Sequence, residues 1–236
     1  MNVKQQGISG YWLKVIAVVS MLIDHTSAVI LEQIPGLENP AFLMRIIGRL
    51  AFPIYCFLLV EGFYHTRSRA KYAGRLFLFA LISEVPFDLA FSSKILEFNY
   101  QNVFFTLFIG LLTMIAYRAV EEKEEWNQAL KVILYILIVA AGMALAYFLK
   151  TDYAEKGVFC IMVLYIFRKK KMWQLIAGCA SFIWETPALF GFIPIAFYNG
   201  TRGWKMKYFF YIFYPAHLLI LYLLCYFMGI SGYSAV

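Results

Sequence analysis

The chain alternates between long apolar runs and short polar links. Nine apolar segments can be delimited, at residues 11–31, 42–64, 72–93, 102–119, 128–149, 154–168, 172–184, 187–198 and 208–229. A helix needs about 20 mostly apolar residues to cross the hydrocarbon core of a bilayer, and only helices and closed barrels satisfy the backbone there. The pattern predicts an all-α integral membrane protein, a polytopic bundle of about nine transmembrane helices.

The composition agrees with this class. Of the 236 residues, 62% are hydrophobic, whereas soluble domains have about 45–50% apolar residues. The links between the apolar runs are too short to hold a soluble domain, so we expect one transmembrane domain over residues 1–236. The first apolar run is too long and too charged for a cleavable signal peptide.

The links predict an orientation in the membrane. Residues 65–71, 168–171 and 201–207 are strongly basic, whereas the links at 32–38, 94–97 and 150–155 are neutral or acidic. The link at 121–126 is acidic yet falls on the cytoplasmic side in this topology, because acidic residues contribute little to orientation. Short links rich in Lys and Arg stay in the cytoplasm, which places the N-terminus inside. Topology and contact with anionic lipid account for the basic residues, so nucleic-acid binding is not expected.

The segment 172–198 decides the number of spans. If it were one tilted helix, the basic link at 201–207 would lie outside and the count would be eight. Two short helices broken near Glu185-Thr186-Pro187 keep that link inside and give nine. Short broken helices occur where protein shelters them or where they line a cavity.

The first apolar segment contains Lys14, Asp24 and His25. Ionisable groups inside a span are costly and indicate a functional site. A neutral imidazole serves as a general base or as an acyl-carrying nucleophile; the structural alternative for His25 is a hydrogen bond to a neighbouring helix. Lys14 and His25 are about 16 Å apart along a helix, which suits a long ligand whose anionic end lies near Lys14.

Four further charges are predicted at the same outer level as His25. Arg45 and Arg49 are one helical turn apart, and so are Glu84 and Asp88. Unpaired charges would be costly at that depth, so we expect these arginines and carboxylates to pair. Two roles remain open for them, the fixing of helix packing and the building of a catalytic pocket.

The basic link after the second segment includes Arg67 and Arg69, with Arg75 following. Topology and anionic lipid explain them, and a cytosolic donor that carries phosphate would also be attracted there. The cysteines lack metal-ligand spacing and are expected to be buried as small hydrophobic residues; no metal is expected. They are Cys56, Cys160, Cys179 and Cys225.

Four segments together resemble the TraX family. They are LIDH at 22–25, RIIGRLAFPIYCFLLVEGFYHTRSRAKYAGRLFLFALISEVPFDLAF at 45–91, QNVFFTLFIGLL at 101–112 and YFFYIFYPAHLLIL at 208–221. The resemblance extends over nearly the whole chain and is strongest in residues 12–112. The namesake of this family N-acetylates the pilin subunit of a conjugative plasmid.

The resemblance implies a transmembrane acyltransferase of the bacterial cytoplasmic membrane. TraX is similar to a wider group of such enzymes, in which a basic residue and a His with ten residues between them mark the active site. Lys14 and His25 match that spacing, with Lys where Arg is commoner. Acetyl-CoA would bind from the cytoplasm, and an amine or hydroxyl of a pilin-like peptide or surface glycan would accept the acetyl group outside.

The resemblance also implies roles for the charged residues. His25, beside Asp24, would act as general base, with an acetyl-imidazole intermediate as the alternative. Arg45 or Arg49 would stabilise the thioester oxyanion or orient Glu84 and Asp88. The candidate contacts to acetyl-CoA are Lys14, Arg67, Arg69 and Arg75.

Two other classes of function compete with this prediction. Intramembrane charges and a broken helix are also found in transporters, although the small size and the lack of a repeat argue against one. A non-enzymatic partner in the assembly of pili would show no turnover.

Overall fold

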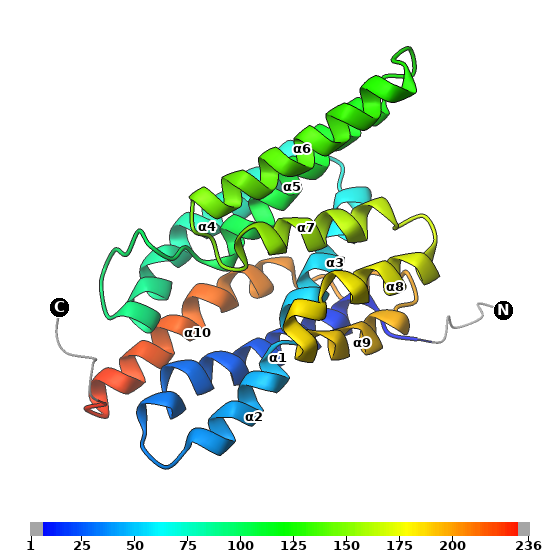
Figure 1. Cartoon of the computed structure of the whole chain (residues 1–236). Helices are drawn as coiled ribbons and strands as arrows, with labels where there is room; N and C mark the ends of the chain where they lie inside the picture. The colour runs from blue at the N-terminus through cyan, green and yellow to red at the C-terminus, as the bar shows by residue number, and fades with distance from the viewer. Residues whose placement is uncertain (1–6, 231–236) are drawn as a thin grey trace. The chain divides into compact units, whose positions relative to one another are not determined.

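The computed structural model describes residues 7–230. Within this range the chain forms helices and no β-strand element. Ten α-helices and two 3₁₀ helices follow one another (Figure 1). They are α1 (Gly10–Val29), η1 (Leu31–Gln33), α2 (Glu38–Gly48), α3 (Ala51–His65), α4 (Arg69–Ser92), α5 (Val103–Glu121), α6 (Gln128–Phe148), α7 (Ala154–Ile166), α8 (Lys171–Ser181), η2 (Ile183–Gly191), α9 (Phe192–Ala196) and α10 (Lys207–Phe227).

The all-α class is confirmed. Five stretches of the described chain are long and apolar enough to cross a membrane: Gly10–Gln33, Glu38–His65, Val103–Glu121, Gln128–Phe148 and Tyr208–Phe227. The remaining helices are shorter or more polar. The count of about nine spans is therefore not confirmed and stays a prediction.

The break near Glu185 is confirmed. Glu185 has φ −127° and ψ 72°, which lies outside the helical region and interrupts η2. Pro187 follows two residues later and cannot donate a backbone hydrogen bond. The sequence predicted two short helices on either side of this break, at 172–184 and 187–198. The first is present as α8, whereas the chain from Ile183 onward forms the 3₁₀ segment η2 followed by the five-residue α9.

Asparagine side chains fix the starts of two helices. The side-chain oxygen of Asn102 accepts a hydrogen bond from the backbone N–H of Phe104 at the start of α5, and that of Asn127 accepts one from Leu130 at the start of α6. Such caps satisfy backbone donors that the first helical turn leaves without partners.

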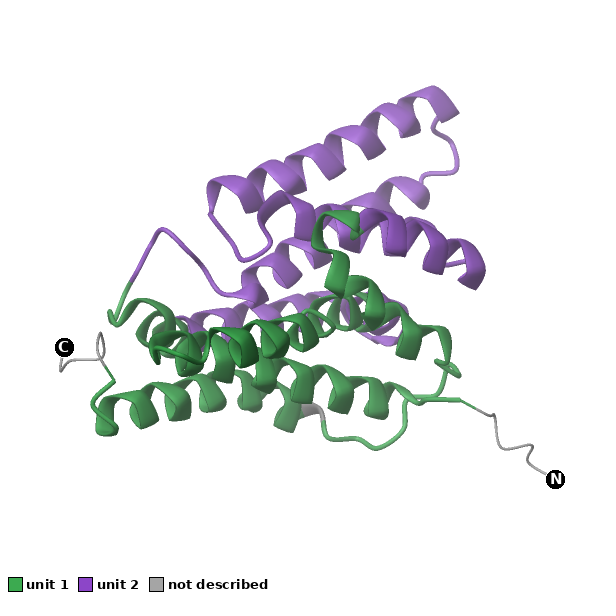
Figure 2. Ribbon diagram, turned by 60° about the horizontal axis from the view of Figure 1, so that its bottom comes forward, with its two compact units in different colours: residues 1–58, 85–96, 182–236 green, residues 59–84, 97–181 purple. Residues whose placement is uncertain are grey.

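Contacts divide the chain into two compact units (Figure 2). Unit 1 comprises residues 1–58, 85–96 and 182–236, and unit 2 comprises residues 59–84 and 97–181. Unit 1 thus contains α1, α2, η2, α9 and α10, whereas unit 2 contains α5 to α8. The assignment of residues 1–236 to one domain stays a prediction.

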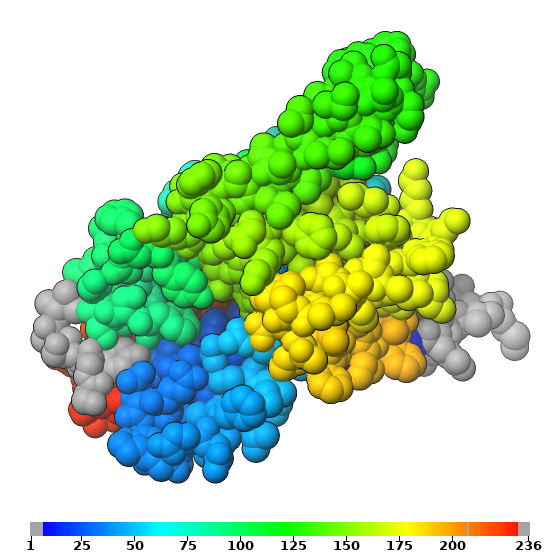
Figure 3. Space-filling view, in the orientation of Figure 1, coloured from blue at the N-terminus to red at the C-terminus, as the bar shows by residue number. Residues whose placement is uncertain are grey.

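In unit 2, α5, α6 and α7 pack against one another. Only 11% of the most apolar stretch of α6 is buried, and Ile133, Ile136 and Leu137 are exposed. The side chains of α6 are visible at the surface along the helix (Figure 3). An exposed apolar face of this length suits contact with lipid.

In unit 1, α1 packs against both α2 and α10. The approach to α2 is close at Gly48, where a Cβ atom would overlap the side chain of Asp24. Three of the four cysteines are buried as predicted, Cys56, Cys160 and Cys225, whereas Cys179 is half-buried. The packing of α1 between two helices determines which side chains meet around His25.

Candidate functional site

Helix α1 presents its polar residues on two different faces. Successive residues of a helix point about 100° apart, and residues eleven apart return to within about 20° of each other. Lys14 and His25 therefore share a face, and both contact α10, Lys14 at Phe210 and His25 at His217. Asp24 points to α2, where it meets Arg45.

The imidazoles of His25 and His217 form a hydrogen bond 2.7 Å long between Nδ1 of His25 and Nε2 of His217. Their planes are parallel within 5° and their centroids are 5.0 Å apart. Rings stacked face to face cannot bring two nitrogens this close, because stacked planes are separated by more than a hydrogen-bond length. The two rings therefore meet edge to edge, nearly in one plane.

Aromatic rings surround this histidine pair. The rings of Phe91 and Tyr214 meet His25 edge to face at centroid distances of 5.5 and 6.0 Å. His217 is only 4% exposed, and its Nδ1 lies 2.7 Å from the carbonyl oxygen of Phe213. His25 is half-buried, so the pair has an apolar setting with limited access.

Asp24 and Arg45 form the shortest ion pair of the site, with 2.6 Å between Oδ2 of Asp24 and Nη1 of Arg45. Arg45 also reaches Glu32, 3.3 Å away, and Arg49 lies 3.7 Å from Glu185. Asp24 thus pairs with α2 and does not orient His25 by a hydrogen bond. Carboxylates of residues 24, 32 and 185 are among the partners of the two arginines.

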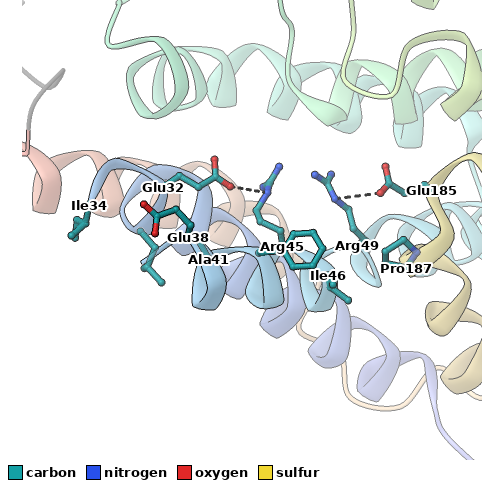
Figure 4. A pocket seen from close by; sticks show the side chains of 11 residues that line it. Glu32, Ile34, Glu38, Ala41, Arg45, Ile46, Arg49, Glu185 and Pro187 are labelled. Atoms are coloured by element: carbon teal, nitrogen blue, oxygen red, sulfur yellow. Dashed lines mark ion pairs between the residues drawn. The ribbon is translucent and has the colours of Figure 1, made fainter. Parts of the chain in front are cut away.

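A pocket of about 450 Å³ opens beside these ion pairs (Figure 4). In Figure 4, Arg45 of α2 and Arg49, which directly follows this helix, lie between Glu32 and Glu185, and dashed lines mark the ion pairs of Arg45 with Glu32 and of Arg49 with Glu185. Glu38 also lines it, together with apolar side chains. Three carboxylates and two guanidinium groups leave the lining with an excess of one negative charge.

Lys14 lies near the start of α1, half-buried. Its Nζ is 5.5 Å from the centroid of Phe210, and no carboxylate within the described chain forms an ion pair with it. Arg202 is close enough for its charge to act on Lys14. Positive charge at this end of α1 favours the binding of an anion.

Three arginines proposed as donor contacts lie in unit 2. Arg67 is exposed, whereas Arg69 lies 3.7 Å from Glu122 and covers the ring of Phe63 at 4.6 Å. The Arg75 guanidinium lies 5.6 Å from the Tyr72 ring centroid, and its buried Nε has no hydrogen-bond partner in the described chain. A neighbouring carboxylate thus already engages Arg69.

Glu84 contacts the start of α5. It accepts a hydrogen bond from the backbone N–H of Asn102, 3.3 Å long, and another from the Asn102 side-chain amide. This contact gives Glu84 a role in holding α4 to α5. Asp88 is 1% exposed. The pairing of Glu84 and Asp88 with Arg45 and Arg49, and any catalytic role for them, stay predictions.

The structure adds residues to those singled out from the sequence. His217, Glu32 and Arg202 contact or influence the predicted residues although they lie far from them in the chain. The YPAH segment that ends at His217 is part of the family resemblance, but nothing in its sequence indicated that His217 would contact His25. Among residues 7–230, no group of three or more His, Cys, Asp or Glu side chains is placed to hold a metal ion.

These features define a class of protein. Membrane-length apolar helices that carry a histidine pair and half-buried ion pairs are typical of a polytopic membrane protein. Residues 9–225 match the family described as TraX protein, and the chain belongs to that family.

Two curated relatives are similar in sequence. One is named "Probable fimbrial assembly protein FimC, serogroup H1", from Dichelobacter nodosus; it is 30% identical over 244 residues, which cover 90% of this chain and 94% of the relative. The other, "Uncharacterized protein RP591" from Rickettsia prowazekii (strain Madrid E), is 28% identical over 98 residues, or 42% of this chain and 33% of the relative. No solved structure matches the chain.

Proposed function

We propose that this protein is a membrane-embedded acetyltransferase that moves an acetyl group from cytoplasmic acetyl-CoA to an acceptor outside the bacterial cytoplasmic membrane. The observation that carries the proposal is the placement of His25 in an apolar, half-buried site on the same face of α1 as Lys14. Membership of the TraX family supports it, because the namesake of that family acetylates pilin.

His25 acts as the general base of the transfer. The nucleophilic nitrogen or oxygen of the acceptor attacks the carbonyl carbon of the thioester while His25 takes its proton. The carbon–sulfur bond then breaks, and the thiolate of CoA leaves and receives a proton from the imidazolium. Acetyl-CoA and the acceptor are thereby converted to the acetylated acceptor and free CoA.

Lys14 binds the anionic part of the donor. Its distance from His25 along α1, about 16 Å, separates the charged end of a long ligand from its reactive end. Arg202 adds a second cation at this end. The phosphate contacts of Arg67, Arg69 and Arg75 stay predictions from the sequence, and Glu122 already engages Arg69.

The pocket beside Arg45 and Arg49 receives the acceptor. Its excess of carboxylates favours a cationic or neutral group over an acidic one, and this suits the amine of a peptide. Arg45 connects the pocket to Asp24, the neighbour of His25 in α1. An arginine in this position would also stabilise the negative charge that develops on the thioester oxygen.

The membrane orientation that suits this reaction has the N-terminus inside. The basic links at 65–71, 168–171 and 201–207 then face the cytoplasm, where acetyl-CoA and anionic lipid are found. Lys14, near the start of α1, would lie toward the donor side.

A role in fimbrial assembly without catalysis is the competing function. It draws on the name of the Dichelobacter nodosus relative, and it requires neither turnover nor binding of acetyl-CoA. A small transporter is a further alternative, which would move its substrate without breaking a thioester.

Purified protein in detergent, incubated with acetyl-CoA labelled in the acetyl group, distinguishes these functions. We expect slow thioester hydrolysis or self-labelling by the wild type, loss of both in His25→Ala, and weaker donor binding in Lys14→Ala. His65→Ala, at the exposed end of α3, is the matched control and should behave like the wild type. Failure of the folded wild type to bind acetyl-CoA at micromolar concentrations would refute the proposal.

A further inference from the structure

We propose that His217 is a positioning residue that fixes the tautomer of His25, so that Nε2 of His25 carries the lone pair used as the base. The inference deepens the proposed acetyl transfer and rests on it. The observation that carries it is the chain of two hydrogen bonds from the Phe213 carbonyl through His217 to His25.

The direction of the first hydrogen bond follows from its acceptor. A carbonyl oxygen has no proton to give, so Nδ1 of His217 must donate to the oxygen of Phe213. Both groups lie on α10, four residues apart, where the helix itself holds the ring in place. One nitrogen of His217 is thereby committed as a donor.

The second hydrogen bond then has a fixed direction as well. His217 is 4% exposed, and no carboxylate among the described residues contacts its ring. A buried cation without a counter-ion is costly, so the ring is neutral and Nε2 has a lone pair. Nε2 of His217 must therefore accept, and the proton in the hydrogen bond belongs to Nδ1 of His25.

The position of this proton determines which nitrogen of His25 can act as the base. A neutral imidazole with its proton on Nδ1 has its lone pair on Nε2. Nε2 of His25 takes part in no hydrogen bond within the described chain, and the residue is half-buried, so this nitrogen is available to an acceptor. The in-plane meeting of the two rings holds the base in one orientation.

This role differs from that of a buried histidine that merely packs. A packing role depends on ring volume, so His217→Phe would retain it. A tautomer-fixing role depends on the acceptor at Nε2, which Phe lacks and which the side-chain oxygen of Gln provides. The two substitutions therefore separate the two roles.

Nitrogen chemical shifts of isotope-labelled histidines read the tautomer directly. The chain has 3 histidines, so single variants, including His65→Phe, assign every signal. We expect wild-type His25 to carry its proton on Nδ1. His217→Phe should shift the proton to Nε2 in a large share of molecules, whereas His217→Gln should retain the wild-type signature.

Acetyl transfer measured on the same samples completes the test. Loss of an outer-shell partner of a functional histidine costs about 10–100-fold, so His217→Phe should lower kcat by that factor with KM for acetyl-CoA nearly unchanged, and His217→Gln should restore much of kcat. A wild-type His25 with its proton on Nε2, or a His217→Phe protein with wild-type kcat, would overturn the inference. Absence of acetyl transfer by the wild type would overturn the proposed function instead, while the chemical shifts would still decide the tautomer.

Discussion

The ion pair between Asp24 and Arg45 makes a quantitative prediction about stability. The Asp24 side chain is 12% exposed, and Arg45 is its ion-pair partner among the described residues, 2.6 Å away. Arg45 has a second partner, Glu32 at 3.3 Å. Removal of Arg45 therefore leaves Asp24 without its ion-pair partner, whereas removal of Asp24 leaves Arg45 paired with Glu32.

Arg45→Met keeps the apolar stem and leaves a buried carboxylate without its cation, which costs about 3–5 kcal/mol. Asp24→Asn leaves Arg45 with Glu32, so the cost is that of a weakened charged hydrogen bond, about 1–2 kcal/mol. The combined variant leaves no buried charge without a partner, because Glu32, which also loses Arg45, has a side chain that is 45% exposed. It should therefore be more stable than Arg45→Met alone. The coupling free energy expected from the cycle is about 2–3 kcal/mol.

Reversible unfolding in mixed micelles, followed by circular dichroism, measures the four proteins of this cycle. Glu122→Gln, which removes an exposed partner of Arg118 at the end of α5, is the control and should change little. A coupling free energy below about 0.5 kcal/mol, which is the error expected for independent sites, would refute the assignment of Asp24 and Arg45 as a buried pair.

Further predictions concern the packing of α1 against α2, the helix caps of α5 and α6, and the binding of acetyl-CoA near Lys14. Gly48→Ala should cost about 1–3 kcal/mol in the same unfolding assay, because the added methyl group would displace Asp24. Asn102→Ala should lower the melting temperature more than Asn127→Ala does. Both variants lose a helix cap worth about 0.5–2 kcal/mol, but the side-chain amide of Asn102 also donates hydrogen bonds to Glu84 and to the carbonyl oxygen of Ala80. Lys14→Met should raise KM for acetyl-CoA about tenfold while kcat changes little, since it removes ground-state binding; an unchanged KM would contradict the donor role.

The length of the apolar runs was sufficient to predict most of the long helices of the fold. Long segments such as 102–119 and 128–149 became α5 and α6, whose bounds differ by no more than two residues from those expected. The break at Glu185 was also predictable, because two short helices keep the basic link at 201–207 on the cytoplasmic side. The 3₁₀ geometry of η2 was not, since short segments of this kind are decided by tertiary packing.

The candidate site was predictable only in part. His25 stood out because an ionisable residue inside a span is rare, and its separation from Asp24 followed from helix geometry. Its partner His217 lies 192 residues away in the chain, and no local pattern encodes a contact over that separation. Depth alone predicted that Arg45 would meet a carboxylate, but it could not select Asp24 and Glu32.

Reconstitution into vesicles tests the central claim, transfer across the membrane through His25, most directly. Vesicles would be loaded with acetyl-CoA labelled in the acetyl group, and a peptide with a free amine would be added outside. The account predicts that label appears on the external peptide with the wild type and with His65→Ala, and not with His25→Ala. Label that appears equally with His25→Ala, or none with a folded wild type that binds acetyl-CoA, would contradict it.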